Sequence, residues 1–228
     1  MLNKIHANIP SALADIFDGA TVLVGGFGGA GLPYELVHGL IDQGARDLTI
    51  VNNNSGTGRD GLAALVDAGR VRKMICSFPK AADPKSDPNI FLRWYKQGRI
   101  ELELVPQGTI VERLRAAAAG LGGVYCPTGA GTLLAEGKEV RMIGDKQYLL
   151  ELPLHGDFAL IKAHQGDRWG NLSYRKAARN FNPVMAMAAK ATIAQVQQTL
   201  ELGQLDPEHV VTPGIFVQRV VSIPGANT

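Results

Sequence analysis

The feature that most constrains the fold is the alternation of short apolar runs with longer helical patterns through the first half of the chain. The apolar runs predict strands over residues 21–24, 48–51, 73–78 and 100–105. Patterns with helical spacing predict helices over residues 34–42, 61–68, 89–97 and 109–118, the first of them starting at Pro33. This succession is typical of an α/β protein with a mostly parallel sheet and crossover helices, and that is the fold class we predict.

The pattern changes after about residue 120. Residues 124–137 are rich in glycine, proline and threonine and predict turns. Further strands are predicted over residues 148–152, 159–163, 191–196 and 215–221, with an alanine- and methionine-rich helix over 183–190. No linker rich in proline, glycine or serine divides the chain, so we predict a single domain over residues 1–228 with a frayed C-terminal tail.

Composition excludes several classes of protein. The net charge is +2, and the basic residues are spread along the chain without a long run, which argues against binding to nucleic acid or a membrane surface. Residues 1–10 lack the apolar core of a signal peptide, and no apolar stretch approaches the roughly 18 residues of a transmembrane helix. Cys76 and Cys126 lie far apart without metal-binding spacing. We therefore expect a cytoplasmic protein with reduced core thiols and no bound metal.

A glycine-rich loop lies between the first predicted strand and its helix. It consists of Gly25, Gly26, Phe27, Gly28, Gly29, Ala30 and Gly31. Glycines let a backbone turn sharply and approach a ligand closely, and a helix N-terminus favours anions, although such a loop can also be a simple tight turn. It lacks the Lys-Ser/Thr ending of a P-loop. A dinucleotide fingerprint also fits poorly, because asparagines at 52–54 follow the second strand in place of an acidic residue.

The longer stretch over residues 18–33 resembles the signature of family I CoA-transferases: Asp-Gly, a hydrophobic strand, Gly-Gly-Phe, then Gly-x-Pro. Further blocks resemble the family in the same order, at residues 53–56, 106–109, 127–132, 170–181 and 213–218. The resemblance covers roughly residues 10–221. It implies the CoA-transferase fold, a Rossmann-like open sheet, and binding of coenzyme A at the glycine loop.

The resemblance also implies that this chain lacks the family's nucleophilic glutamate. Family I enzymes use a glutamate as nucleophile, which ends up as a glutamyl-CoA thioester, and this glutamate lies in a Glu-x-Gly-x-x-Gly motif of the B half. Of the glutamates here, only Glu201 has a glycine two residues on, and Asp206 occupies the sixth position. This chain would then be the A half, and we expect a separate B half as its partner, in a heterodimer that can pair into an A2B2 tetramer. Coenzyme A and succinyl-CoA would be substrates, with no permanently bound cofactor.

This half would then supply amide donors to the oxyanion that develops when a thioester is attacked. Asn53 is our candidate because it follows a strand at the edge where α/β ligand sites lie. Its neighbours are rivals, and the asparagines could instead form Asx turns. Gln107 is carried over from the family's active-site glutamine, although it could be merely exposed on a loop.

Other polar residues have two interpretations each. The loop at residues 128–132 could contact substrate or partner, or only turn the chain. The cations Arg175, Lys176 and Arg179 could hold a carboxylate or phosphate, but a solvated or ion-paired face is the commoner arrangement. His155 and His164 lack a ligand-like partner at short spacing, so we expect structural roles for both.

The resemblance leaves two candidate acceptor substrates, 3-oxoadipate and acetoacetate. Residues 76–79, 153–164 and 166–171 resemble enzymes acting on 3-oxoadipate, in aromatic catabolism, more than those acting on acetoacetate. The second carboxylate of 3-oxoadipate calls for an extra cation, for which Arg168 and Lys80 are candidates. The loop over residues 80–89 is longer than its family counterpart. A sugar-phosphate isomerase-like enzyme and a non-catalytic binding module for CoA or an organic acid are rival classes.

Overall fold

A computed structural model describes residues 2–80 and 89–225 of the chain. Its first half contains β1 Ile5–His6, α1 Ile9–Leu13, β2 Thr21–Val24, α2 Tyr34–Gln43, β3 Leu48–Val51, α3 Leu62–Asp67, β4 Val71–Cys76, α4 Ile90–Lys96, β5 Glu101–Leu104 and α5 Gln107–Ala119. Its second half contains β6 Val124–Cys126, η1 Leu133–Ala135, β7 Val140–Ile143, β8 Lys146–Glu151, β9 Gly156–Asp167, β10 Leu172–Ser173, η2 Lys176–Arg179, α6 Asn182–Ala188, β11 Ala189–Leu200, η3 Pro207–His209, η4 Gly214–Phe216 and β12 Arg219–Ser222. The loop predicted to be long lies mostly at 81–88, outside the described residues.

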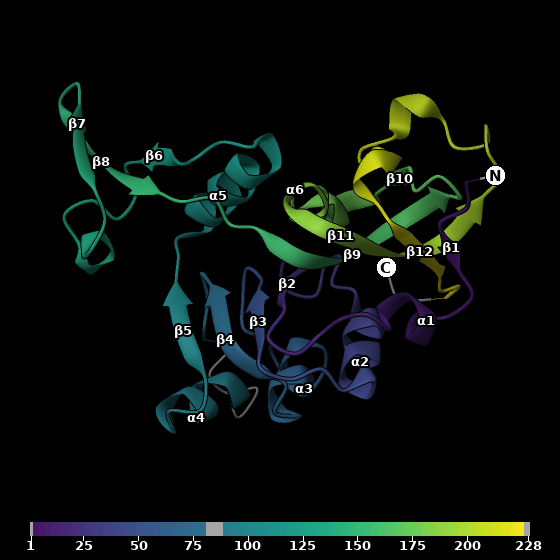
Figure 1. The fold of residues 1–228 in the computed structure, drawn as a ribbon, viewed down its shortest axis with the longest axis horizontal. Helices are drawn as coiled ribbons and strands as arrows, with labels where there is room; N and C mark the ends of the chain where they lie inside the picture. The colour runs from purple at the N-terminus through teal and green to yellow at the C-terminus, as the bar shows by residue number, and fades with distance from the viewer. Residues whose placement is uncertain (1, 81–88, 226–228) are drawn as a thin grey trace.

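One large sheet organises the molecule. Its strands run in the order β1-β12-β11-β9-β2-β3-β4-β5, and each neighbouring pair in this order is parallel. The short β10 adds an antiparallel pair to β9, with Leu172 opposite Gly166. Figure 1 shows this sheet crossing the middle of the molecule. The predicted α/β class with a mostly parallel sheet is confirmed.

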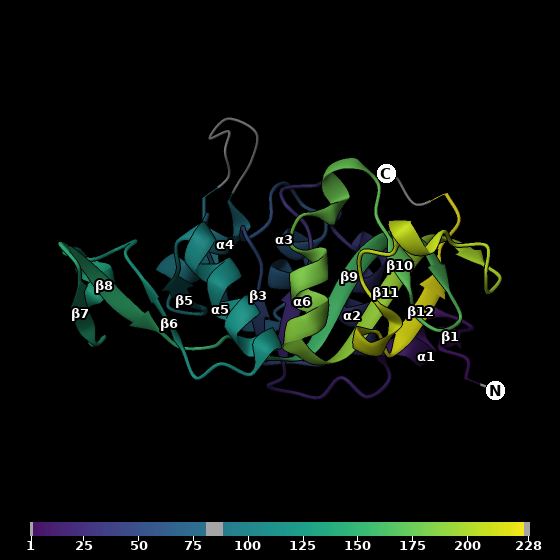
Figure 2. The ribbon, with the colours of Figure 1, turned by 90° about the horizontal axis from the view of Figure 1, so that it is seen from above.

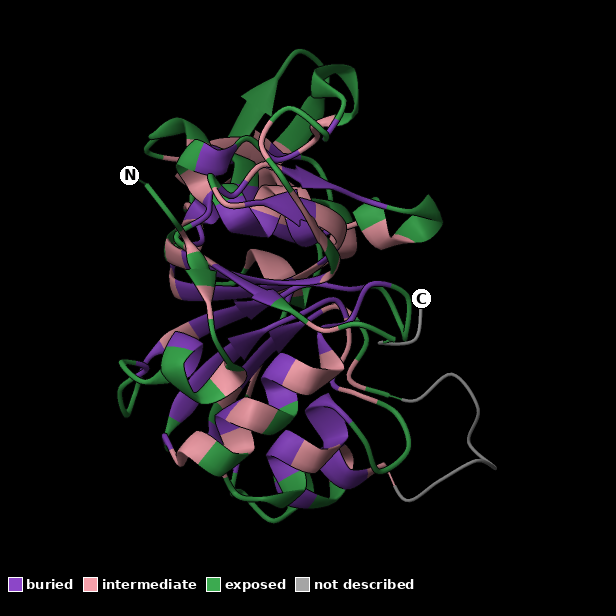
Figure 3. Cartoon of the chain, turned by 90° about the vertical axis from the view of Figure 1, so that its right-hand side faces the viewer, coloured by how far each residue is buried: buried purple, intermediate pink, exposed green. Residues whose placement is uncertain are grey.

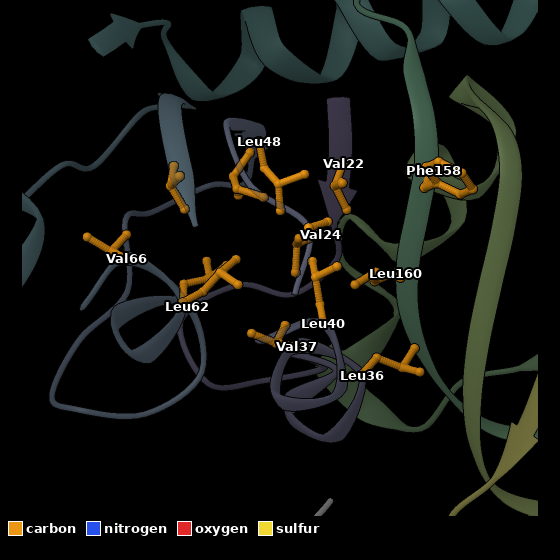
Figure 4. Close-up of a cluster of buried hydrophobic side chains, with 14 of the residues drawn as sticks. Val22, Val24, Leu36, Val37, Leu40, Leu48, Leu62, Val66, Phe158 and Leu160 are labelled. Atoms are coloured by element: carbon orange, nitrogen blue, oxygen red, sulfur yellow. The ribbon is translucent and has the colours of Figure 1, made fainter. Parts of the chain in front are cut away.

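Helices cover both faces of this sheet (Figures 1 and 2). Successive side chains of a strand point to opposite faces, so Val22 and Val24 join one core while Leu23 joins the other. The first core packs against α1–α4 and includes Leu36 and Leu40 of α2, as Figure 4 shows. The second packs against α5 and α6. Figure 3 shows the buried strands between the two layers. The helices thus leave the strand ends free to form a site.

A smaller antiparallel sheet, ordered β6-β8-β7, extends from the main body at the upper left of Figure 1. Only β8 was predicted from the sequence. The composition of residues 124–137 did not predict β6, which pairs with β8 through Val124 and Glu151. All four residues of β7 are exposed. Their side chains therefore gave no alternation of buried and solvated positions to detect.

The end of the chain also differs from the prediction. Residues 215 and 216 form part of the 3₁₀ turn η4, and the last strand begins at Arg219. A long-range contact explains the difference, because the Gly214 N–H donates to Asn171 Oδ1 at 2.9 Å. The predicted helix over 183–190 ends at Ala188, where β11 begins to pair with β9. Within the described residues, no helix is long and apolar enough to span a membrane.

Candidate active site

The carboxyl ends of β2, β3, β4 and β5 meet at one edge of the sheet, because the strands are parallel and adjacent. The glycine loop follows β2, the asparagines follow β3, and Gln107 follows β5. Gln107 is the first residue of α5, two positions earlier than the predicted start of that helix. The two predicted amide donors thus lie on one edge with β4 between them, about 10 Å apart by strand spacing.

The three asparagines have different hydrogen bonds. Asn52 is fully buried, and its Nδ2 donates to the Val24 carbonyl oxygen at 2.6 Å while its Oδ1 accepts from the Asn54 N–H at 2.9 Å. Asn54 Oδ1 accepts from the Gly56 N–H at 2.9 Å. Both form the Asx-type bonds considered above, and they shape the loop.

Asn53 differs from both neighbours. Only 3% of the residue is exposed, yet its Oδ1 has no hydrogen-bond partner among the described residues. Its backbone is held firmly, since its carbonyl oxygen accepts from the N–H groups of Ser77 and Phe78 at 3.1 Å each. A buried amide left unpaired costs about 1–3 kcal/mol, so such groups in a folded protein call for an explanation, for example a ligand.

Two further polar atoms at this edge of the sheet are also buried without a partner in the described structure, and the sequence analysis did not single them out. Ser77 Oγ, just beyond β4, and Thr109 Oγ1, in the first turn of α5, are buried without a partner in the described structure. Ser77 lies in the strand predicted over residues 73–78 and Thr109 begins the helix predicted over 109–118, but neither was a candidate site residue. Their significance depends on burial and missing partners, which a sequence does not display.

Acidic residues are absent from the described segments that form this edge, residues 25–31, 52–55, 76–79 and 106–109. The nearest carboxylate on β5, Glu103, is engaged by Arg113 at 2.8 Å and Lys73 at 2.6 Å. Cys76 ends β4, but burial raises the pKa of its thiol to about 12, against the weaker effect of a hydrogen bond with the Phe78 backbone. The described residues of this edge therefore offer amides and hydroxyls, and no anionic nucleophile.

The glycine loop is fixed by a residue that the sequence analysis missed, Asn182 at the start of α6. This residue is fully buried, and its Nδ2 donates to the carbonyl oxygens of Gly31 at 3.1 Å and Ala178 at 2.7 Å. A Cβ on Gly25 would lie 1.8 Å from Asn182 Oδ1. Gly31 has φ +69°, a left-handed conformation. Close packing and a positive φ thus explain two of the glycines.

The outer part of the loop is turned toward solvent. Phe27 and Ala30 exchange backbone hydrogen bonds at 2.9 and 3.1 Å, and Phe27 is 46% exposed. In the described structure, the N–H groups of Gly28, Gly29 and Gly31 have no acceptor. Backbone amides in such an arrangement suit an anionic or carbonyl oxygen.

The remaining candidates lie on or beyond elements other than β3. His164 Nδ1 and Gln197 Oε1 are in hydrogen-bond contact at 3.1 Å between the neighbouring strands β9 and β11. Arg168 and Lys80 lie beyond β9 and β4 respectively. The group Arg175, Lys176 and Arg179 lies beside the glycine loop on η2 and the residue before it.

An open α/β sheet with an amide-rich carboxyl edge and a fixed glycine loop is an arrangement suited to an oxygen-rich ligand. Residues 6–222 match the coenzyme A transferase family. The chain belongs to that family, and the resemblance identified in its sequence is confirmed.

Relatives in this family are close. The chain is 63% identical over 226 residues to the A subunit of 3-oxoadipate CoA-transferase from Pseudomonas putida, covering 99% of this chain and 96% of the relative. It is 46% identical to the A subunit of a probable succinyl-CoA:3-ketoacid coenzyme A transferase from Bacillus subtilis, covering 96% and 90%.

Among solved structures, an acyl-CoA transferase of Escherichia coli O157:H7, in a thioester complex with CoA, superimposes with a TM-score of 0.85 at 25% identity. The alignment covers 99% of this chain and 48% of that one, so the chain spans about half the length of that transferase. Glutaconate coenzyme A-transferase of Acidaminococcus fermentans shares the fold, with a TM-score of 0.80 at 23% identity and coverage of 97% and 76%.

Proposed function

We propose that this chain is the A half of a transferase that moves coenzyme A from succinyl-CoA to 3-oxoadipate. The observation that carries the proposal is the 63% identity to the corresponding half of a 3-oxoadipate CoA-transferase across nearly the whole of both chains. A second relative of the same name, from Acinetobacter baylyi, is 58% identical over 223 residues. Relatives named for 3-ketoacids stand at 46% and below, which makes acetoacetate the second candidate acceptor.

In the proposed reaction, a glutamate carboxylate of the B half attacks the thioester carbonyl of succinyl-CoA, and the C–S bond breaks to release the CoA thiolate. The thiolate attacks the glutamyl carbonyl of the resulting anhydride, which frees succinate and leaves a glutamyl-CoA thioester. The 3-oxoadipate carboxylate then repeats both steps in the opposite sense, yielding 3-oxoadipyl-CoA and free glutamate. Each attack places negative charge on a carbonyl oxygen.

Asn53 and Gln107 act in this scheme as donors to that oxyanion. Asn53 fits because the residue is buried at the strand edge and its Oδ1 has no hydrogen-bond partner among the described residues. Rotation of an asparagine amide exchanges its oxygen and nitrogen, so the same position can present Nδ2 as a donor. Gln107 adds a second amide at the N-terminus of α5, where the helix dipole also favours negative charge. The loop over residues 25–31 binds coenzyme A.

The B half supplies the nucleophile, and the active unit is an A–B heterodimer able to pair into a tetramer. The absence of an acidic residue from the described segments of the site edge supports this division of labour. We place the protein in the cytoplasm as a single-domain component of that heterodimer. The two buried free thiols support that compartment, because cytoplasmic cysteines stay reduced.

The proposal is tested by assaying CoA transfer from succinyl-CoA to 3-oxoadipate and to acetoacetate, with this chain alone and with its cognate B half. We expect activity only in the mixture, with a higher kcat/KM for 3-oxoadipate. Preference for acetoacetate would keep the family and change the acceptor. Turnover by this chain alone would contradict the assignment of the nucleophile to the B half.

A further inference from the structure

A cavity opens beside the glycine loop and is lined in part by Gly29, Ala30 and Gly31. It has a volume of about 450 Å³ and lies between the loop, the C-terminal part of β9 and the segment at residues 175–178. Lys162, Arg175 and Lys176 line it together with His164, and none of its described lining residues is acidic. The larger pocket against α1 and α2, of about 620 Å³, has the opposite character, with three carboxylates in its lining. The cavity beside the loop is therefore selective for anions by charge.

Two of its cations are available to a ligand. Arg175 and Lys176 are exposed, and neither forms an ion pair with any described residue. Elsewhere pairing is common, as in Arg113 with Glu103 and Lys190 with Asp157, both at 2.8 Å. An unpaired arginine next to a lysine can bind a carboxylate or phosphate through several charge-assisted hydrogen bonds. Of the solvated or ion-paired face considered from the sequence, the described residues form no ion pair with these two cations, and both cations are exposed to solvent.

Hydrogen bonds to neighbouring residues hold the backbone of the segment that carries these cations. Lys176 has φ +50°, a left-handed conformation that costs energy outside glycine. The segment is tied to the glycine loop by Asn180, whose Nδ2 donates to the carbonyl oxygens of Ala30 at 3.0 Å and Ala177. The Asn182 bond to Ala178 adds a second tie. The loop amides of Gly29 and Gly31 thus sit against a fixed cationic segment, an arrangement preorganised for binding.

We propose that this cavity binds an anionic oxygen group of the substrate, with Arg175 and Lys176 as its charged ligands. The inference rests on the proposed function and extends it to a specificity site. Succinyl-CoA and 3-oxoadipate each carry a carboxylate remote from the reacting carbonyl, and coenzyme A carries phosphates. Carboxylate and phosphate oxygens present the same chemistry to these two cations. The experiment below therefore has one arm for the substrate carboxylate and one for the phosphates of coenzyme A.

The test uses Arg175→Gln and Lys176→Asn, singly and together, in the complex with the B half. Asparagine is chosen at 176 because it tolerates the left-handed conformation. Lys96→Gln is the matched control, since Lys96 is an exposed cation at the end of α4, toward the opposite edge of the sheet. Thermal unfolding and kcat report whether each variant folds and assembles.

If the ligand is the remote carboxylate, the double variant raises the KM for 3-oxoadipate by about tenfold or more, leaving the KM for acetoacetate unchanged. If it is a phosphate, CoA binding measured by calorimetry weakens by a similar factor, whichever acceptor is used. Either result supports the proposal. Unchanged KM values and CoA affinity in the double variant overturn it, as does a fall in kcat alone.

The two proposals fail in different ways. A wild-type complex that transfers CoA to neither acceptor contradicts the proposed function. An active wild-type complex whose double variant behaves like Lys96→Gln leaves the function intact and removes the anion site.

Discussion

The side-chain amide of Asn182 donates a hydrogen bond to the carbonyl oxygen of Gly31, 3.1 Å away, and so fastens α6 to the glycine loop. The same side chain accepts from the Lys162 N–H at 3.0 Å. One buried residue thereby sets the position of the loop relative to β9 and η2, the elements that surround the cationic cavity.

Replacing Asn182 by alanine should lower the free energy of unfolding by about 2–3 kcal/mol. The change leaves the buried Gly31 carbonyl and the partly buried Lys162 N–H without their partner, and unpaired groups of this kind carry a desolvation cost. Urea denaturation measures the effect. Asn180→Ala is the matched control, because Asn180 is only half-buried and should cost about 1 kcal/mol or less. Equal losses from the two variants would contradict this account of the loop.

Asn53→Ala should lower kcat by about 10²-fold or more with little change in stability. The loss of one oxyanion donor produces an effect of this size, and Asn53 Oδ1 gives up no partner among the described residues. Steady-state kinetics of the complex with the B half and urea denaturation of the same sample separate the two effects.

Asn52→Ala serves as the contrast to Asn53→Ala. It should destabilise the fold by about 1–3 kcal/mol, because the buried Val24 carbonyl loses its donor. Normal turnover by Asn53→Ala would remove that residue from the catalytic role.

Gly25→Ala should be poorly tolerated, whereas Gly29→Ala should be nearly neutral for folding. A methyl group on Gly25 meets Asn182 Oδ1 at 1.8 Å inside the core, and overpacking costs about 1–3 kcal/mol or more. A methyl group on Gly29 lies 3.4 Å from the Tyr34 hydroxyl, near ordinary contact. Melting temperatures of the two purified variants provide the measurement, and similar temperatures would count against the steric argument.

Acid should weaken the ion pair between Arg113 of α5 and Glu103 of β5, which helps to place α5 on the sheet. Burial tends to raise the pKa of Glu103, but hydrogen bonds from Arg113 and Lys73 outweigh burial and leave the pKa below its usual value of 4.5. A lowered folded-state pKa contributes stability above the unfolded pKa, and that contribution is lost as pH falls below about 4.5. The free energy of unfolding should therefore be higher for the wild type than for Glu103→Gln at pH 7, and this difference should shrink as the pH falls through the acid range. A constant difference at every pH would exclude this linkage.

The sequence was most informative where a strand is buried on both faces. The strands at 21–24 and 48–51 agree with their predicted limits, since continuous apolar runs bounded by turns leave little choice. It was uninformative for β7, whose residues are all exposed. It also misplaced the start of β12, because the contact between Gly214 and Asn171 joins residues far apart in the chain.

Some residues of the candidate site could likewise be predicted from the sequence, and others could not. Position along the chain located the asparagines at a strand end, but only the hydrogen bonds of Asn52 and Asn54 distinguish them from Asn53. Asn182 could not be predicted, since its partners on the glycine loop lie 151 residues away. The family resemblance suggested Gln107 and the missing glutamate, which the local patterns alone did not.

The pairing of β1 with β12 has a consequence for biosynthesis. Ile5 lies opposite Val220, and Val22 of β2 lies opposite Phe158 of β9, so the sheet joins segments made early in translation to segments made late. Parallel pairings over such separations form slowly, because a long loop must close before any contact is gained. The glycine loop also lacks its Asn182 tether until residue 182 has left the ribosome. The nascent chain must therefore keep its N-terminal strands from aggregating while the ribosome finishes the second half.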